Sequence, residues 1–365
     1  MRSSVKYVLL IMVMDFYFGY AQSDFPYMQP DSDILSLADY KPAPLIRMKY
    51  DASMAVLLYR NAYKSIEEMS APEMKLGGIR VNPITKNSGR TSYYTGMKIL
   101  DVKTGIQSEV TGLPENANLS NMTWSDDQSK MAFINTLVNG NELWYLDINT
   151  KKCHKLSEPI INACISNVLE WTKDNLSILA TTVVANQGDI KDAKLAISTG
   201  PTIMENDGKK AQNRTYQDLL KNAVDEYNFE NLITSEITKF DLKGGSKLFK
   251  KAAMYMDMNF SPDGNYLMTY EIQKPFSYIV TYDRFPIDIN LSSKDGQFIT
   301  TYYQYPLTED LPKGFMAVRK GKRSINWRAD KAATLYWAEA LDGGDPEVEV
   351  GERDDIYEQN ARIKR

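Results

Sequence analysis

The sequence predicts an all-β fold, a β-propeller of four-stranded antiparallel blades. Three observations favour it: a short unit recurs along the chain, a second type of hairpin half lies between its copies, and the composition suits strands. Aromatic residues make up 11% of the 365 residues, with 23 tyrosines, and such rings fill the pleated faces of sheets. An irregular β-sandwich or a set of paired sheets is the alternative architecture.

The recurring unit consists of an aromatic residue, an aspartate three positions on, a polar turn and an apolar strand. Its four clear copies begin at Trp124, Trp171, Phe260 and Trp327. The corresponding aspartates are Asp127, Asp174, Asp263 and Asp330. A weaker fifth copy begins at Tyr50. We expect the aromatic residue to anchor the inner strands and the aspartate oxygen to cap the turn.

Strands of the second type end in polar turns near residues 101–105, 147–151 and 241–246. Together the two types predict about five blades over residues 45–365, an incomplete propeller preceded by a lead-in segment at 22–44. The spacing from Trp124 to Trp171 matches the length of one blade, whereas the later intervals require insertions. One insertion is expected at about 186–230, with a surface loop followed by a helix.

The expected helix depends on apolar spacing. Tyr216, Leu219, Leu220 and Val224 recur along one face, as in an amphipathic helix. The polar stretch at 188–211 precedes them and is predicted to be a surface excursion.

The N-terminus resembles an export signal. Arg2 and Lys6 precede an apolar stretch, and Gly19 and Ala21 place small residues at the two cleavage positions. We predict a signal peptide at 1–21, cleaved after Ala21, and a periplasmic or secreted protein. No other segment is apolar and long enough to form a transmembrane segment.

Charge and cysteine content narrow the function classes. The net charge of −4, with dispersed lysines and arginines, gives no reason to expect a nucleic-acid partner. Cys153 and Cys164 are the only cysteines, and they form either a disulfide around a short loop or two buried free thiols. Their spacing matches no metal site, and we predict neither a metal nor a cofactor.

Serine-hydrolase chemistry has one weak match. A nucleophile elbow reads Gly-x-Ser-x-Gly, followed downstream by an aspartate and then a histidine. The nearest stretch is Ala196-Ile-Ser198-Thr-Gly200, which Pro201 follows where a helix should begin. The sole histidine, His154, lies upstream, so the order of a triad is wrong. We interpret Ser198 as a loop serine and predict no catalytic residue.

Other charged groups are interpreted as structural. Three pairs of carboxylates resemble those that glycosidases use, but they lie in or near predicted turns: Asp126 with Asp127, Asp342 with Asp345, and Asp354 with Asp355. Capping or solvation accounts for them. The basic run from Arg319 to Arg323 is interpreted as a solvated turn rather than a binding patch.

Three blocks carry a more specific resemblance. The first runs from Gly200 to Asn222, the second combines Phe260-Ser-Pro-Asp-Gly with Pro275-Phe-Ser-Tyr and Arg284-Phe-Pro, and the third runs from Trp327-Arg-Ala-Asp to Glu339-Ala-Leu-Asp-Gly-Gly. Together, in order from about Asp24 to Tyr357, they resemble the N-terminal β-propeller of prolyl-oligopeptidase-type serine peptidases, in the branch similar to glutamyl endopeptidases.

The resemblance implies a two-part enzyme. A seven-bladed propeller would cap a C-terminal α/β-hydrolase domain, and peptides would be cleaved after acidic residues at a Ser-Asp-His triad between the two. This sequence stops where the hydrolase domain should follow. We therefore expect a truncated, secreted propeller portion, inactive alone, that restricts or guides peptide substrates toward a separate α/β-hydrolase chain. A free-standing envelope propeller that binds proteins or peptides is the alternative.

Overall fold

The computed structural model describes residues 30–165, 167–192 and 215–361. The chain divides into two units, Met1–Pro42 and Ala43–Arg365. In the first unit, the described residues 30–42 contain helix α2 (Ser32–Ala38), which buries none of its residues. The predicted signal peptide at 1–21 lies outside the described residues, so it stays a prediction.

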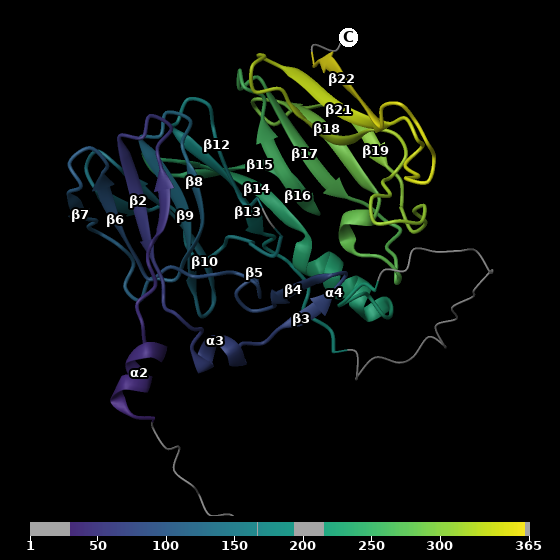
Figure 1. Ribbon diagram of the computed structural model, residues 1–365. Helices are drawn as coiled ribbons and strands as arrows, with labels where there is room; N and C mark the ends of the chain where they lie inside the picture. Colours follow the sequence, from purple (N-terminus) through teal and green to yellow (C-terminus); the bar gives the residue numbers. More distant parts are fainter. Residues whose placement is uncertain (1–29, 166, 193–214, 362–365) are drawn as a thin grey trace, which may run out of the picture. The chain divides into compact units, whose positions relative to one another are not determined.

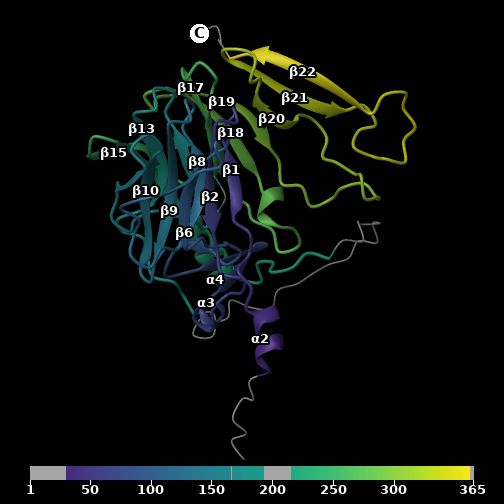
Figure 2. The same ribbon diagram turned by 60° about the vertical axis from the view of Figure 1, so that its left-hand side comes forward.

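The second unit is all-β, as predicted, and its strands form five successive antiparallel blades (Figures 1 and 2). The first blade contains β1 (Leu45–Met48), β2 (Met54–Tyr59), β6 (Gly96–Asp101) and β7 (Gln107–Glu109). The second contains β8 (Leu119–Trp124), β9 (Lys130–Leu137), β10 (Gly140–Asp147) and β11 (Lys152–Lys155). The third contains β12 (Leu169–Trp171), β13 (Ser177–Val183), β14 (Ser235–Asp241) and β15 (Ser246–Ala253).

The fourth blade contains β16 (Tyr255–Phe260), β17 (Tyr266–Ile272), β18 (Ile287–Ser293) and β19 (Phe298–Tyr305). In the fifth, the described strands are β20 (Arg323–Trp327), β21 (Thr334–Ala340) and β22 (Asp354–Asn360). Inside each blade, neighbouring strands in sequence are neighbours in the sheet. The small sheet inserted in the first blade was not predicted; it contains β3 (Met74–Leu76), β4 (Ile79–Asn82) and β5 (Asn87–Ser88).

Hydrophobic cores lie between consecutive blades. Side chains alternate across a strand, so one strand can contribute to two cores. In β9, Met131 and Phe133 pack with residues of the first blade, whereas Ala132 and Ile134 pack with residues of the third. This explains why β9 is buried without interruption between its two end residues: both of its faces are covered, as expected for a blade between two others.

Two of the recurring aromatic residues join the inner strands of successive blades, in the anchoring role that the sequence predicts. Trp171 Nε1 donates a hydrogen bond to the carbonyl oxygen of Thr123 on the preceding blade at 3.2 Å. Trp327 Nε1 donates in the same way to the carbonyl oxygen of Asn259 at 3.4 Å. Burying the indole while satisfying its N–H fixes one blade against the next.

The recurring aspartates cap turns in three of the four clear copies. Each accepts a hydrogen bond from a hydroxyl that follows the aromatic residue: Ser125 donates to Asp127, Thr172 to Asp174 and Ser261 to Asp263, all at 2.6 Å. Burial raises the pKa of these carboxyl groups, but the hydroxyl and backbone hydrogen bonds outweigh it, so each pKa is lowered. The fourth copy has Arg328 instead of a hydroxyl, and its guanidinium pairs with Asp330.

The two ends of the blades differ. The turn end consists of the short connections between first and second strands at 49–53, 125–129, 172–176, 261–265 and 328–333, with those between third and fourth strands. The insertion end consists of the described residues of the longer connections at 60–95, 156–165 with 167–168, 184–192 with 215–234, 273–286, 306–322 and 341–353; those of the first and third blades lie at the bottom of Figure 1. Antiparallel order explains this sorting, because alternate connections leave a sheet at opposite ends.

The helix of the third blade begins later than predicted. Helix α4 runs over Ala223–Ile233, and the side chain of Asn222 caps it by accepting hydrogen bonds from the N–H groups of Val224 and Asp225. Tyr216 lies outside the helix because Asp218 adopts a positive φ of 58°, which a helix excludes. The buried face of α4 consists of Asn228, Phe229, Leu232 and Ile233.

Candidate functional site

The insertion end is assembled from connections of three blades. The turn between β3 and β4 contains Gly77 and Gly78, with φ values of 58° and 91°. The Gly78 N–H donates to the carbonyl oxygen of Asp218, and the Gly77 carbonyl accepts from the N–H of Tyr282. A Cβ on Gly78 would lie 2.4 Å from the Thr281 side chain, so the close approach requires glycine.

An ion pair and an aromatic cluster hold these connections together. Arg80 Nε donates to Asp218 Oδ2 at 2.7 Å, and the Asp218 side chain is only 10% exposed. Phe229 of α4 packs edge-on against Phe276 and Phe285, with ring centroids 5.2 and 5.6 Å apart. The insertions of the first, third and fourth blades therefore share one core with the fourth and fifth blades.

Buried amides attach the insertion of the first blade to the second blade. Asn141 Nδ2 donates to the carbonyl oxygens of Thr85, at 2.7 Å, and Ile161, at 3.1 Å. Asn87 Nδ2 donates to Thr136 Oγ1 at 2.9 Å. Because both asparagines are at most 1% exposed, these hydrogen bonds are shielded from water and fix residues 85–87 in place.

A buried arginine lies within this end. Arg284 closes the short helix η1 (Tyr282–Arg284) in the connection between β17 and β18 and is 8% exposed. Its guanidinium carbon lies 5.1 Å from the ring centroid of Tyr216. Over residues 30–165, 167–192 and 215–361, no carboxylate or carbonyl accepts a hydrogen bond from this guanidinium. The Tyr216 hydroxyl is enclosed and also lacks a partner. The arrangement can bind an anion.

Comparison with known proteins gives two curated relatives across nearly the whole chain. A probable chloroplastic glutamyl endopeptidase of Oryza sativa subsp. japonica is 35% identical over 349 residues, which are 92% of this chain and 37% of that protein. One of the same description in Arabidopsis thaliana is 34% identical over 347 residues, covering 92% and 36%. The chain is homologous to one portion of these glutamyl endopeptidases. It spans a little over a third of their length.

The resemblance to the glutamyl-endopeptidase branch is thus confirmed. No family model matches the chain. Among solved structures, the acylaminoacyl peptidase of Pyrococcus horikoshii aligns with a TM-score of 0.43 and 14% identity, over 90% of this chain and 40% of that chain.

Of the serine and the histidine considered in the sequence, the structure places only the histidine. Ser198 and Gly200 lie outside the described residues. His154 lies in β11, where its ring stacks on Tyr145 at 4.9 Å. In the described ranges, no three histidine, cysteine or acidic side chains gather as metal ligands. There, too, no helix is long and apolar enough to cross a membrane.

The two cysteines are buried free thiols, the second of the alternatives that the sequence left open. Cys153 lies in β11 and Cys164 in the connection that follows. Burial raises the pKa of each thiol to about 12. Both are therefore protonated at neutral pH and unsuited to nucleophilic or metal-binding roles.

The carboxylate pairs take structural roles. Asp342 accepts a hydrogen bond from the Gly344 N–H and pairs with Arg353 at 2.8 Å. Asp126 pairs with Lys173, which links the turns of two neighbouring blades at 2.8 Å. These contacts give Asp126 and Asp342 structural partners, so neither is free for the acid/base role that paired carboxylates play in glycosidases.

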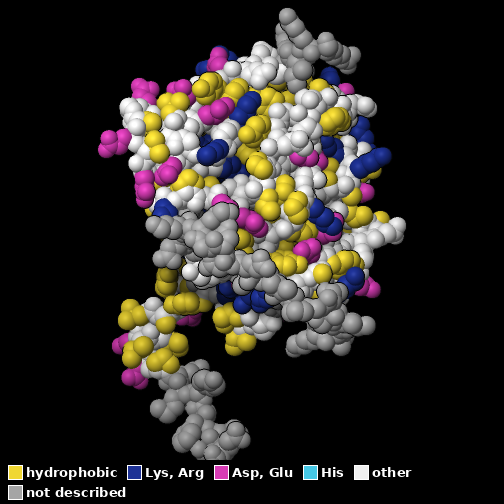
Figure 3. Space-filling model, turned by 90° about the vertical axis from the view of Figure 1, so that its right-hand side faces the viewer, with side chains coloured by type: hydrophobic (Ala, Val, Ile, Leu, Met, Phe, Trp, Pro, Cys, Tyr) yellow, Lys and Arg dark blue, Asp and Glu magenta, His cyan; other side chains and the backbone are white. Residues whose placement is uncertain are grey.

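The basic run is engaged within the chain rather than solvated. Arg319 donates to the carbonyl oxygen of Asp283 at 2.9 Å, and Arg323 pairs with Asp354. The Lys322 ammonium lies 3.8 Å from the ring centroid of Trp337, and burial lowers its pKa. On the side shown in Figure 3, lysine and arginine side chains are interspersed with acidic and apolar ones.

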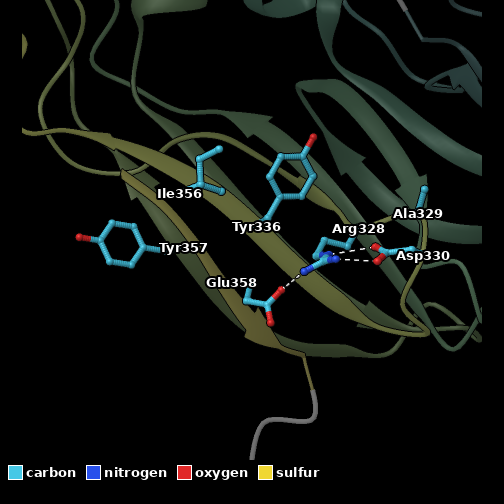
Figure 4. Close-up of a pocket in the computed structure, with 7 residues that line it drawn as sticks. All are labelled: Arg328, Ala329, Asp330, Tyr336, Ile356, Tyr357 and Glu358. Atoms are coloured by element: carbon cyan, nitrogen blue, oxygen red, sulfur yellow. Dashed lines mark hydrogen bonds and ion pairs between the residues drawn. The ribbon is translucent and has the colours of Figure 1, made fainter. Parts of the chain in front are cut away.

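A hollow of about 450 Å³ lies on the fifth blade (Figure 4). It is lined by Arg328, Ala329, Asp330, Tyr336, Ile356, Tyr357 and Glu358. Figure 4 shows Arg328 directed at Asp330 and Glu358, which both pair with it. The charged side chains of this hollow are paired with one another, so they have less capacity to bind a charged ligand than the unpaired guanidinium of Arg284.

Proposed function

We propose that this chain is the non-catalytic propeller portion of a secreted serine endopeptidase and that it restricts or guides peptides toward a hydrolase domain. The observation that carries the proposal is the similarity to two glutamyl endopeptidases over 92% of the chain. The hydrolase is supplied outside this portion, and its substrates are peptides with acidic residues, in keeping with the relatives' names.

The insertion end is the side that meets the hydrolase in this proposal. A blade with four strands returns the chain to the end where it started, because consecutive strands run in opposite directions. Strand β1 starts at the insertion end, and β7, β11, β15 and β19 finish there. A domain joined before the first strand or after the last strand of a run of complete four-stranded blades would therefore be attached at the insertion end. Binding and catalytic residues also concentrate on loops that a rigid scaffold positions.

The test is purification of the tagged full chain from its native host, followed by native mass measurement and labelling with a serine-reactive phosphonate. We expect the isolated chain to stay unlabelled and a co-purifying hydrolase to be labelled. Labelling of this chain itself would contradict the proposal. A stable monomer bound to an unrelated protein would instead support the envelope binding module.

Export belongs to the same proposal. Its support is the basic start and apolar stretch ahead of Ala21. Mass spectrometry of the mature protein should give an N-terminus at Gln22 in the periplasmic or secreted fraction. An intact Met1 on protein from the cytosolic fraction would overturn it.

A further inference from the structure

Arg284 differs from four half-buried arginines at the blade edges. Each of these pairs with a carboxylate: Arg80 with Asp218, Arg323 with Asp354, Arg328 with Asp330 and Arg353 with Asp342. A fifth, Arg319, donates to the carbonyl oxygen of Asp283. In the described ranges Arg284 has no such partner, although it is the more deeply buried. An unpaired buried charge costs several kcal/mol, so native proteins almost always pair one. Within the part of the chain that the structure describes, the guanidinium edge is therefore a candidate place for a ligand.

The surroundings hold the Arg284 backbone in one position. Its N–H donates to the carbonyl oxygen of Thr281, and its carbonyl oxygen accepts from the N–H of Thr308, both at 2.9 Å. The next residue, Phe285, is fully buried in the aromatic cluster with Phe229. A group fixed in this way loses little conformational entropy when a ligand binds.

Two hydrogen-bond donors without acceptors lie together here. The guanidinium carbon lies over the Tyr216 ring, and among the described residues its N–H groups have no acceptor. These N–H groups are left to bind a partner in the guanidinium plane. The Tyr216 hydroxyl is the second donor without an acceptor. A planar, two-oxygen acceptor fits the guanidinium edge best, because carboxylate and guanidinium form paired parallel hydrogen bonds.

The acidic side chains of neighbouring residues are already engaged. Asp283 accepts from Thr281 Oγ1 at 2.6 Å, Asp218 accepts from Arg80, and Glu309 accepts from Ser277 Oγ at 2.6 Å. None of these three pairs with Arg284. The charge of Arg284 therefore remains to be neutralised from outside this set of residues.

We propose that Arg284 binds a carboxylate of a peptide held at the insertion end. This rests on the proposed function, because a peptide must reach that end for the contact to form. The guanidinium would select an acidic side chain or a C-terminal carboxylate over the corresponding amide, since a buried charge left unpaired discriminates strongly. Arg284 would thus determine specificity without taking part in bond cleavage.

The experiment measures binding of three fluorescent octapeptides to the full chain by anisotropy. All share a neutral sequence: one has a central glutamate and an amidated C-terminus, one has glutamine and an amidated C-terminus, and one has glutamine and a free C-terminus. We expect the glutamate peptide, the free-terminus peptide or both to bind about tenfold more tightly than the amidated glutamine peptide. The two acidic peptides separate side-chain from C-terminal recognition.

Variants assign the preference to Arg284. Arg284→Gln should reduce the ratio of affinities to near one, and Arg284→Lys should retain part of it because the charge persists without the paired geometry. Tyr216→Phe keeps the ring and should reduce the ratio by a few-fold. Arg328→Gln is the matched control, because that arginine is already paired at the turn end, and it should leave the ratio unchanged. Near-ultraviolet circular dichroism checks that each variant keeps its fold.

The outcomes separate this inference from the proposed function. Equal binding of all three peptides, or a ratio that survives Arg284→Gln in a folded variant, overturns the role of Arg284 and leaves the peptide-guiding function standing. If no peptide binds at all, the proposed function loses its support together with the inference.

Discussion

The turn end and the insertion end of the blades are built in opposite ways. At the turn end one short device repeats: an aromatic residue, a hydroxyl and an aspartate, as in Phe260, Ser261 and Asp263. The hydroxyl and aspartate contacts of that device join residues within a few positions of one another. At the insertion end no segment repeats, and the decisive contacts join residues far apart in sequence, as Arg80 and Asp218 do.

The difference indicates where a propeller holds its scaffold and where it has room for a site. Because the same short sequence unit recurs in each blade, the local contacts at the turn end agree with the overall fold and help to specify it. The insertion end lacks this repeated unit, and ordering its long connections costs conformational entropy. Burial of apolar side chains in the shared core offsets that cost. The single buried arginine without a described counter-charge, Arg284, lies at this second end.

The largest expected effect comes from the core under the insertion end. Replacing Phe229 by alanine removes a fully buried ring that contacts Phe276 and Phe285. We expect unfolding in urea to lose about 3–5 kcal/mol, the usual cost of deleting a buried phenylalanine. Leu248→Ala on β15, where the side chain is 54% exposed, is the control and should change stability little.

The shape of the transition tests the comparison itself. Because the insertion core and the core between the fourth and fifth blades are one cluster, Phe229→Ala should lower a single transition. Two separate transitions, with only the first one shifted, would show that the insertion end is an independent layer and that the blades do not depend on it.

Much of the fold is predictable from the sequence because the turn-end device is local. The positions of Asp127, Asp174 and Asp263 identify the turns, and the apolar runs after them identify strands with both faces covered. Apolar spacing predicts a start for helix α4 that is too early. The better signal for its N-terminus is Asn222, a capping residue followed by acidic residues in the first turn.

The candidate site could not be predicted in the same way. Arg284 was visible only as part of an Arg-Phe-Pro block, and its importance arises from what its neighbours bind instead. No local pattern reveals that Asp283 is held by Thr281 or that Tyr216 lies beneath the guanidinium. The small sheet β3–β5 could not be predicted for the same reason, since contacts with distant residues such as Asp218 hold it in place.

A second, smaller effect contrasts the buried Glu142 with the half-buried Glu170. Near the insertion end, burial raises the pKa of Glu142, but hydrogen bonds from Lys155, Trp144 and Asn135 outweigh it and the pKa is lowered. Its contribution to stability is therefore present above the unfolded pKa of about 4.3 and is lost as pH falls. Near the turn end, burial raises the pKa of Glu170 to about 7. Its contribution is present below about 4.3 and is lost as pH rises toward 7.

Glutamine variants should therefore shift stability in opposite directions. At pH 8, Glu142→Gln should cost about 1.5–3 kcal/mol, because hydrogen bonds to a charged group are lost, and at pH 3 the cost should fall. Glu170→Gln should stabilise the protein at pH 8 by up to about 3–4 kcal/mol, the shift from about 4.3 to about 7 at about 1.4 kcal/mol per unit, and change little at pH 4. Urea midpoints across this pH range measure both. If the changes in stability of the two variants follow pH in the same direction, the two glutamates do not have the opposite pKa shifts that their contacts indicate.

The smallest expected effect lies in the turn-end device. Ser261 is fully buried; its hydroxyl donates to Asp263 and accepts from the Tyr266 N–H at 3.1 Å. Ser261→Ala should cost about 1 kcal/mol, the usual net worth of such a hydrogen bond. Asp330→Ala should cost less, since the fifth blade lacks the hydroxyl and its aspartate makes an exposed ion pair with Arg328. If urea titrations find the two losses equal, the hydroxyl adds nothing to the cap, and the repeated turn end stabilises the blades through its aromatic residues alone.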